Sequence, residues 1–256
     1  MDEGKHHGGW AMARTLKEIG IDRVFGLAGG HVMAFFDGCL TEGVTVVDTR
    51  HEQAGVHMAE GWALSTGEVG IAAVTAGPGL TNAATGIVNA QQAGSPVVVI
   101  CGDTATELDH REAVQQIEID HLYGRVAKWT RTVRDPKRLA ASLKEAIHVA
   151  RSGRPGAAVL QVPMDVSMGD AVEQEPWDAP VSRSAPDPAD VERAIEVLTG
   201  TERATILAGS GAHWSRAGDA LRELTERTGL PVTTTSAARG LLPDNHPNCL
   251  GYLLHG

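Results

Sequence analysis

Short apolar runs alternate with amphipathic stretches along most of the chain, and this alternation constrains the fold more than any other feature of the sequence. The run Pro96–Cys101, PVVVIC, is apolar throughout, as expected for a parallel strand covered by helices on both faces. Further strand patterns occupy 22–27, 69–76, 126–133 and 157–162, and helix patterns occupy 11–19, 31–40 and 139–150. A further helix is expected from Thr81 or Asn82, both of which are plausible caps. The series predicts an α/β fold with a parallel sheet flanked by helices.

A second unit follows a break in this pattern. The stretch Gly169–Asp190 is rich in proline and acidic residues and has no apolar periodicity, which predicts a linker. Helix and strand patterns then return at 191–198, 204–208, 217–228 and 231–235. We expect domains at 1–168 and 189–256, joined by a linker at 169–188. The second is an incomplete Rossmann-like α/β domain with two or three strands, whose open sheet edge another polypeptide must cover.

Charge and cysteine content exclude several classes of protein. With 22 basic and 32 acidic residues, the formal charge of −10 opposes nucleic acids and anionic membranes. Cys39, Cys101 and Cys249 lie far apart without a CxxC pair, which fits a reducing compartment. Because no apolar run approaches the length of a membrane span and the amino end has no signal-peptide pattern, we expect a cytoplasmic protein.

The stretch 43–67 holds the strongest candidate for chemistry. A strand pattern turns at Arg50 and His51 into an alanine-rich helix pattern, and Glu52 stands at the turn. In parallel α/β sheets, ligands collect at the carboxyl ends of strands beside the following helices, so this carboxylate faces the expected site. A buried carboxylate there is able to act as a proton partner. The alternative is that Glu52 only complements the dipole of its helix.

Familiar signatures are present only in part. His51-Glu52 begins like a helical zinc site, but Gly55 stands where the second histidine belongs, and no metal site is expected. The loops GPGLTN at 77–82 and GSGAHW at 209–214 lack the third glycine of a dinucleotide fingerprint. No P-loop and no nucleophile elbow occurs. A nicotinamide-dependent oxidoreductase therefore has little support, although such loops are natural places for a ligand to meet helix amides.

Six segments in a fixed order carry a family resemblance: VFGLAGG at 24–30, DTRHEQAGVHMAEGWA at 48–63, VTAGPGLTNAATGI at 74–87, AGSPVVVICGD at 93–103, VQQIEID at 114–120 and SGRPGAAVLQVPMDV at 152–166. Together they resemble the pyrimidine-binding domain of the thiamine-diphosphate enzymes, in the branch of acetohydroxyacid synthase, benzaldehyde lyase and oxalyl-CoA decarboxylase. The resemblance covers residues 10–168, and residues 189–256 look like the first part of that family's central domain.

The resemblance implies a cofactor, thiamine diphosphate, and a role for each matching residue. Glu52 would hydrogen-bond N1′ of the aminopyrimidine and so promote deprotonation of the thiazolium C2. Gln115 would approach the reacting carbon. His31, at the place where benzaldehyde lyase looks to have a catalytic histidine, would exchange protons with the substrate alkoxide; the alternative is a helix cap or a surface residue. The pyrimidine site would be lined by Ala28, Gly29, Gly30, Thr75, Gly77, Pro78 and Asn82.

Two departures narrow these expectations. Ala28 stands where acetohydroxyacid synthases carry the proline of PGG, and Val114 stands where they carry a phenylalanine. Both differences weaken the specific assignment of the chain as an acetolactate synthase. The family's diphosphate and Mg²⁺ site, a GDG segment followed by an asparagine, belongs to a carboxyl-terminal domain outside this sequence. We therefore expect Mg²⁺ to be bound by that other domain. His51, His57, His110 and His121 are expected to be mostly structural or exposed.

The resulting hypothesis is the pyrimidine-domain subunit of a split thiamine-diphosphate lyase or carboligase that acts on a 2-keto acid or related carbonyl compound. A second subunit would supply the rest of the central domain and the diphosphate domain, and the pyrimidine domain would also self-associate. The alternative is a noncatalytic, truncated homologue that binds and regulates a full-length relative.

Overall fold

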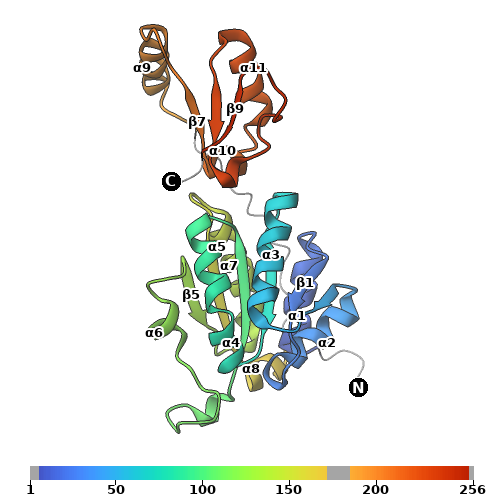
Figure 1. The fold of residues 1–256 in the computed structure, drawn as a ribbon. Coiled ribbons are helices and arrows are strands. Elements are labelled where there is room, and N and C mark those ends of the chain that lie inside the picture. Colours follow the sequence, from blue (N-terminus) through green and yellow to red (C-terminus); the bar gives the residue numbers. More distant parts are fainter. Residues whose placement is uncertain (1–5, 172–184, 254–256) are drawn as a thin grey trace. The chain divides into compact units, whose positions relative to one another are not determined.

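The computed structural model describes residues 6–171 and 185–253 of the 256-residue chain (Figure 1). It divides into two compact units, Met1–Val181 and Ser182–Gly256, which are described separately. Most of the expected linker, residues 172–184, lies outside the described residues. None of the helices formed by the described residues has the length and apolarity that a membrane span requires.

The first unit is built on one six-stranded parallel sheet, which confirms the expected fold class. Its strand order is β2-β1-β3-β4-β6-β5, and every neighbouring pair is parallel. The strands are β1 (Arg23–Gly26), β2 (Thr45–Asp48), β3 (Gly70–Val74), β4 (Val97–Asp103), β5 (Trp129–Thr132) and β6 (Ala157–Pro163). Because all strands run in one direction, their carboxyl ends meet at one edge of the sheet.

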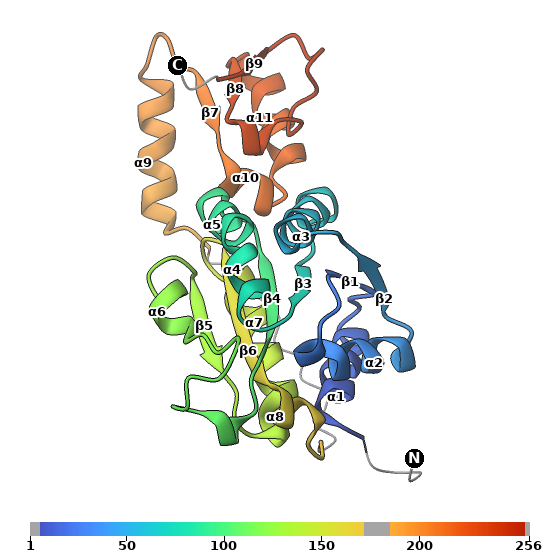
Figure 2. The same cartoon turned by 60° about the horizontal axis from the view of Figure 1, so that its bottom comes forward.

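Helices cover both faces of this sheet (Figures 1 and 2). One face packs against α1 (Gly8–Glu18), α2 (Met33–Glu42) and α7 (Leu139–Arg151), with α8 (Met164–Met168) beside them. The other packs against α3 (Glu52–Thr66), α4 (Pro78–Asn82), α5 (Ala84–Ala93) and α6 (Ile119–Tyr123). Short 3-10 turns add η1 (Gly30–Val32), η2 (Thr106–Leu108) and η3 (Pro136–Arg138).

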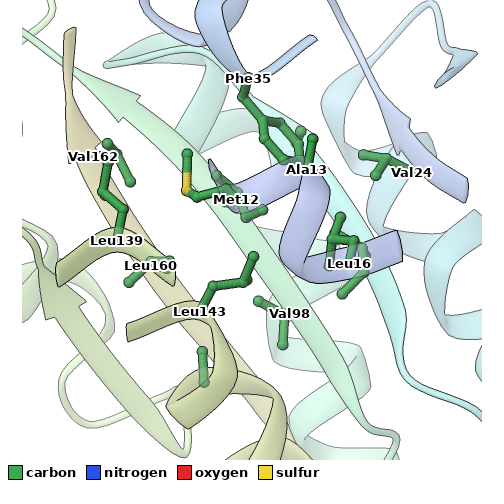
Figure 3. Close-up of a cluster of buried hydrophobic side chains, with 14 of the residues drawn as sticks. Met12, Ala13, Leu16, Val24, Phe35, Val98, Leu139, Leu143, Leu160 and Val162 are labelled. Atoms are coloured by element: carbon green, nitrogen blue, oxygen red, sulfur yellow. The ribbon is translucent and has the colours of Figure 1, made fainter. Parts of the chain in front are cut away.

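The central strands are apolar at successive positions because they serve two cores. Along β4, Val98 and Ile100 enter the core that contains Met12, Leu16 and Leu143 (Figure 3). The alternate residues Val97, Val99 and Cys101 enter the opposite core with Val56 and Ile87. Side chains alternate between faces along a strand, so a strand buried on both faces is apolar at successive positions over most of its length.

In the first unit, the structure corrects one expected helix and adds two short ones. The sequence predicted a helix from Thr81 or Asn82, but α4 already begins at Pro78. The reason lies in Gly77, whose φ of 60° turns the chain sharply, and in Pro78, whose fixed φ suits the first position of a helix. The five-residue helices α6 and α8 are too short to show a helical period and were not predicted.

The second unit holds three parallel strands in the order β7-β8-β9. They are β7 (Ile206–Ala208), β8 (Val232–Thr234) and β9 (Cys249–Tyr252), accompanied by α9 (Pro188–Thr199), α10 (Ser210–Trp214), α11 (Gly218–Thr228) and η4 (Ser236–Ala238). The buried core consists of Ala208, Leu221, Val232 and Leu242, and no residue of α9 is buried. This small sheet agrees with the expected incomplete second domain.

Candidate functional site

The expected site residues gather at the carboxyl edge of the large sheet, around the position where the strand order reverses. From β1 the chain passes to β2 on one side, and β3 then returns to pair with β1 on the other side. The loops after β1 and β3 therefore diverge at this point. Ligands of open α/β sheets bind in the crevice outside such a switch point.

Glu52 is the first residue of α3 and its side chain is buried, with the residue only 7% exposed. His51 caps the helix by accepting a hydrogen bond from the Gln53 amide at 3.2 Å. One carboxylate oxygen of Glu52, Oε2, accepts a hydrogen bond from Asn82 Nδ2 at 3.0 Å. Oε1 receives no donor from the part of the chain that the structure describes. Glu52 therefore presents a buried carboxylate that is oriented by one neighbour and still able to accept a hydrogen bond.

Thr75, directly after β3, joins the two loops at the switch point. A Cβ added to Gly29 would lie 2.5 Å from the Thr75 Cβ, and one added to Gly79 would lie 2.8 Å from its Cγ2. The same Cβ on Gly79 would lie 3.5 Å from Glu52 Oε1. Glycine at 29 and 79 is therefore required for the loops to close on Thr75 and to bring it beside Glu52.

His31 lies in η1, next to the same threonine. Its Nδ1 is 3.3 Å from Thr75 Oγ1, a hydrogen-bond distance. The backbone of Gly102 packs against it so closely that a Cβ at 102 would lie 2.5 Å from the His31 Cβ. Burial lowers the pKa of this imidazole, which favours its neutral form. Thr75 thus holds the imidazole, and Gly102 packs against the His31 backbone and Cβ. The residues that precede the two neighbouring helices as N-caps are Gly29 and Val32.

Gln115 approaches the site from a separate loop between β4 and α6. A Cβ added to Gly77 would lie 2.7 Å from the Gln115 Cα, so the two backbones are in direct contact. Gln115 itself has a φ of 72°, a conformation that side chains rarely adopt. This contact brings Gln115 to the loop that begins α4. No described hydrogen bond joins Gln115 to Glu52.

The remaining expected residues lie around this group without making specific contacts. Ala28, Gly30 and Pro78 are exposed on the divergent loops, and nothing lies within 4 Å of a Cβ placed on Gly30. The side chain of His121 is 84% exposed and that of His57 is partly exposed, next to Glu60. The roles of the site residues stay predictions, but the structure brings Glu52, Asn82, Thr75, His31, Gly77 and Gln115 to one edge of the sheet.

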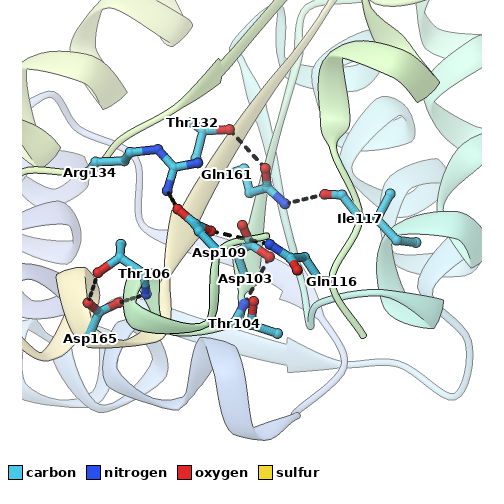
Figure 4. A network of polar contacts seen from close by, with 10 residues as sticks. All are labelled: Asp103, Thr104, Thr106, Asp109, Gln116, Ile117, Thr132, Arg134, Gln161 and Asp165. Atoms are coloured by element: carbon cyan, nitrogen blue, oxygen red, sulfur yellow. Dashed lines mark hydrogen bonds and ion pairs between the residues drawn. The ribbon is translucent and has the colours of Figure 1, made fainter. Parts of the chain in front are cut away.

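A polar network at the same edge was not predicted from the sequence (Figure 4). Asp103 ends β4, is only 4% exposed, and accepts a hydrogen bond from the Thr104 amide at 2.8 Å. Burial raises the pKa of its carboxyl to about 6, with further contributions from Asp109 and Asp165. The sequence held a partial signal, because Asp103 lies two residues after the apolar run Pro96–Cys101, at the carboxyl end of a strand, where sites of parallel sheets collect polar residues.

A second buried carboxylate was also missed. Glu60, on α3, is 5% exposed and accepts hydrogen bonds from Asn89 Nδ2 at 2.6 Å and from Ser95 Oγ at 3.0 Å. It lies two helical turns from Glu52, and its oxygens are both occupied. We assign Glu60 to the joint between α3 and α5.

The site fits the aminopyrimidine expected from the resemblance. A buried carboxyl group with one open oxygen is able to share a proton with a ring nitrogen of the aminopyrimidine, and the exposed loop residues at 28 and 30 leave its surroundings open. Among the described residues, no group of three or more His, Cys, Asp or Glu side chains is arranged to hold a metal ion. A Mg²⁺ ligand set therefore cannot be assigned to these residues.

Comparisons with known proteins identify the family of the chain. Residues 6–123 match the family model described as "Thiamine pyrophosphate enzyme, N-terminal TPP binding domain", and residues 191–256 match "Thiamine pyrophosphate enzyme, central domain". Similar curated proteins include a probable acetolactate synthase large subunit of Methanocaldococcus jannaschii, 33% identical over 97% of this chain and 44% of its own length. The acetolactate synthase isozyme 3 large subunit of Escherichia coli is 35% identical over 96% and 44%.

A relative whose name gives a different activity is equally similar to this chain. The 2-hydroxyacyl-CoA lyase 2 of Bos taurus is 35% identical over 94% of this chain and 44% of its own length. The chain thus spans less than half the length of these curated relatives.

Proposed function

Because the chain belongs to the thiamine pyrophosphate enzymes, we propose that it supplies the pyrimidine-binding half of a lyase or carboligase that cleaves or forms a C–C bond beside a carbonyl group. The relatives named above act, by their names, as acetolactate synthases or as a 2-hydroxyacyl-CoA lyase. The substrate class we propose is accordingly a 2-keto acid or a related carbonyl compound. When bound, the cofactor supplies a nucleophilic carbon and an electron sink for this chemistry.

One observation supports the proposal most strongly: the buried carboxylate of Glu52, held by Asn82 with Oε1 open, at the switch point of the sheet. Glu52 would share one proton with N1′ of the aminopyrimidine: the carboxyl donates the hydrogen bond when it holds the proton and accepts it when N1′ does. Asn82 orients the carboxylate, because its amide occupies Oε2 and leaves Oε1 to the ligand.

We assign two further roles on the substrate side. His31, held by Thr75 and largely neutral because burial lowers its pKa, accepts or returns a proton at the substrate oxygen. Gln115, brought to the site by its contact with Gly77, offers an amide to the reacting carbonyl compound. Both residues reach the site from loops that the glycines at 29 and 77 allow to approach closely.

The diphosphate and Mg²⁺ end of the cofactor requires polypeptide outside residues 1–256 in this proposal. Two findings support it: the relatives are more than twice as long as their matched part, and the small sheet of the second unit ends at β7 and β9 with α9 unburied. We propose that this polypeptide is a second subunit, and that pyrimidine domains pair within the assembly. Oxygen ligands for Mg²⁺ would come from it.

The test is to purify the chain with and without the protein encoded beside it and to measure thiamine diphosphate binding by calorimetry, with and without Mg²⁺. We expect weak binding by the chain alone and tight, Mg²⁺-dependent binding by the assembly. Tight Mg²⁺-dependent binding by the chain alone would refute the need for a second subunit. If Glu52→Gln left the turnover of the assembly unchanged, the chain would be a noncatalytic regulator instead.

A further inference from the structure

The loop that carries Gln115 is strained and yet held in place. Between β4 and α6, three residues other than glycine have positive φ: His110 at 61°, Glu112 at 52° and Gln115 at 72°. Each such conformation costs on the order of 1 kcal/mol or more and persists only where the surroundings enforce it. The contacts that enforce it are therefore part of how Gln115 is placed.

Three anchors fix this loop to neighbouring elements of the first unit (Figure 4). At its start, the Thr106 amide donates to Asp165 Oδ1 at 3.0 Å. At its end, Gln161 Nε2 donates to the Ile117 carbonyl at 2.9 Å, and Gln161 is itself held by Thr132 Oγ1 at 2.8 Å. These two anchors, at Thr106 and Ile117, lie outside the stretch 110–115 that holds the strained residues. The third anchor acts on that stretch more directly.

The third anchor reaches the neighbour of Gln115. Gln116 Nε2 donates to Asp109 Oδ1 at 3.2 Å, and Arg134, just beyond β5, donates from Nη1 to Asp109 Oδ2. The two oxygens of Asp109 thus join the loop to itself and to the sheet. Figure 4 shows Arg134 and Gln116 meeting Asp109 from opposite sides. The side chain of Asp109 is 22% exposed and that of Arg134 is 54% exposed.

We infer that Arg134, acting through Asp109 and Gln116, is a positioning residue that keeps Gln115 at the Glu52 site. The inference rests on the proposed function in so far as it gives Gln115 a role in turnover. Arg134 touches neither Gln115 nor Glu52 in any described hydrogen bond, so its effect passes through the loop. Losing the guanidinium leaves Asp109 bonded only to Gln116 within the loop, so this pair is no longer tied to Arg134 and the strained residues relax away from Gly77.

The chain offers a matched control three residues away. Arg131 also pairs with a carboxylate, that of Glu145 on α7, and their side chains are 36% and 43% exposed. This ion pair has no hydrogen bond to the loop. Arg134→Met and Arg131→Met therefore remove the same charge from the same part of the sheet, but only the first releases Asp109. Both positions are partly exposed, so both variants should fold.

The first arm measures amide hydrogen exchange of residues 104–118 by mass spectrometry in the 256-residue chain, and needs neither cofactor nor turnover. We expect exchange about twofold to fivefold faster in Arg134→Met than in wild type, the range expected for a partly exposed ion pair, and unchanged exchange in Arg131→Met. Equal exchange in the two variants would overturn the inference.

The second arm is a double-mutant cycle in the complete enzyme. Gln115→Asn withdraws the amide by one methylene while tolerating the positive φ. We expect Arg134→Met to lower kcat about twofold to fivefold when Gln115 is present and to leave kcat unchanged in the Gln115→Asn background. Arg134→Lys, compared with Arg134→Met, should restore part of the lost kcat. Equal losses in both backgrounds would overturn the positioning role. If the wild-type assembly showed no thiamine-diphosphate turnover, the proposed function would fail, and the exchange arm would still decide whether Arg134 holds the loop.

Discussion

The buried carboxyl of Asp103 predicts a measurable pH dependence of stability. Its pKa lies at about 6 instead of the ordinary 3.8, mainly because burial disfavours the charged form. As pH rises from 4 to 6, the unfolded chain loses this proton before the folded chain does, so stability falls across that window. Above pH 6 the loss is complete, and a shift of about two units corresponds to about 3 kcal/mol.

Asp103→Asn should remove this loss. The asparagine oxygen still accepts from the Thr104 amide, which Asp103 Oδ1 does at 2.8 Å, but the group no longer ionises. We expect the variant to be more stable than wild type by about 2 to 3 kcal/mol at pH 7.5, and by about 2 kcal/mol less than that at pH 4.5. Urea unfolding of the chain, followed by far-UV circular dichroism at both pH values, measures the difference.

The matched control is Asp219→Asn on α11, where the aspartate side chain is 97% exposed. Its effect should stay within about 0.5 kcal/mol at both pH values. The reasoning would be refuted if Asp103→Asn were destabilising at pH 7.5, or if its gain were the same at pH 4.5, because the carboxyl would then be stabilised in its charged form.

Two further predictions concern packing around α3. Gly70→Ala should destabilise the chain by about 2 kcal/mol or more, since its Cβ would lie 2.0 Å from the Ala59 carbonyl oxygen. Gly61→Ala should stabilise the helix by up to about 1 kcal/mol, because nothing lies within 4 Å of a Cβ at this position. Thermal unfolding of the two variants checks the sign of each change. Ser95→Ala should cost about 1 to 3 kcal/mol by removing the donor at 3.0 Å from buried Glu60, and the exposed Ser65→Ala should cost less than about 0.5 kcal/mol. Equal effects of the two serine variants in urea unfolding would contradict the role of Glu60 at the α3–α5 joint.

Much of the fold could be predicted because its strands serve two cores. A continuous apolar run such as Pro96–Cys101 is typical of a parallel strand covered on both faces, and the helices between the strands show their period. The five-residue α6 was not predicted, because a tertiary contact stabilises it: the Tyr123 hydroxyl donates to the Leu80 carbonyl at 2.6 Å, 43 residues away in sequence. Strand β9 was not predicted either, because its pairing with β8 is irregular and its residues show no clear strand pattern.

The grouping of site residues was predictable for a topological reason. Glu52 and Asn82 are 30 residues apart in the sequence. Glu52 begins α3, which follows β2, and Asn82 ends α4, which follows β3, so both lie at the carboxyl edge of the sheet. The pair formed by Asp109 and Arg134 offered no such signal. Both residues stand on loops or strand ends whose paths depend on the whole fold, so their contact appears only in the structure.

The central claim is that Glu52 exchanges a proton with the bound cofactor, and the most direct measurement is hydrogen–deuterium exchange at the cofactor's C2 in the complete enzyme, followed by quenched-flow NMR. Glu52→Gln should slow this exchange by about 100-fold or more, the usual range for a lost acid–base partner, with the cofactor still bound. Glu60→Gln, at the other buried glutamate of α3, should leave the rate within about twofold of wild type. Exchange at the wild-type rate in Glu52→Gln, with the cofactor bound, would contradict the account.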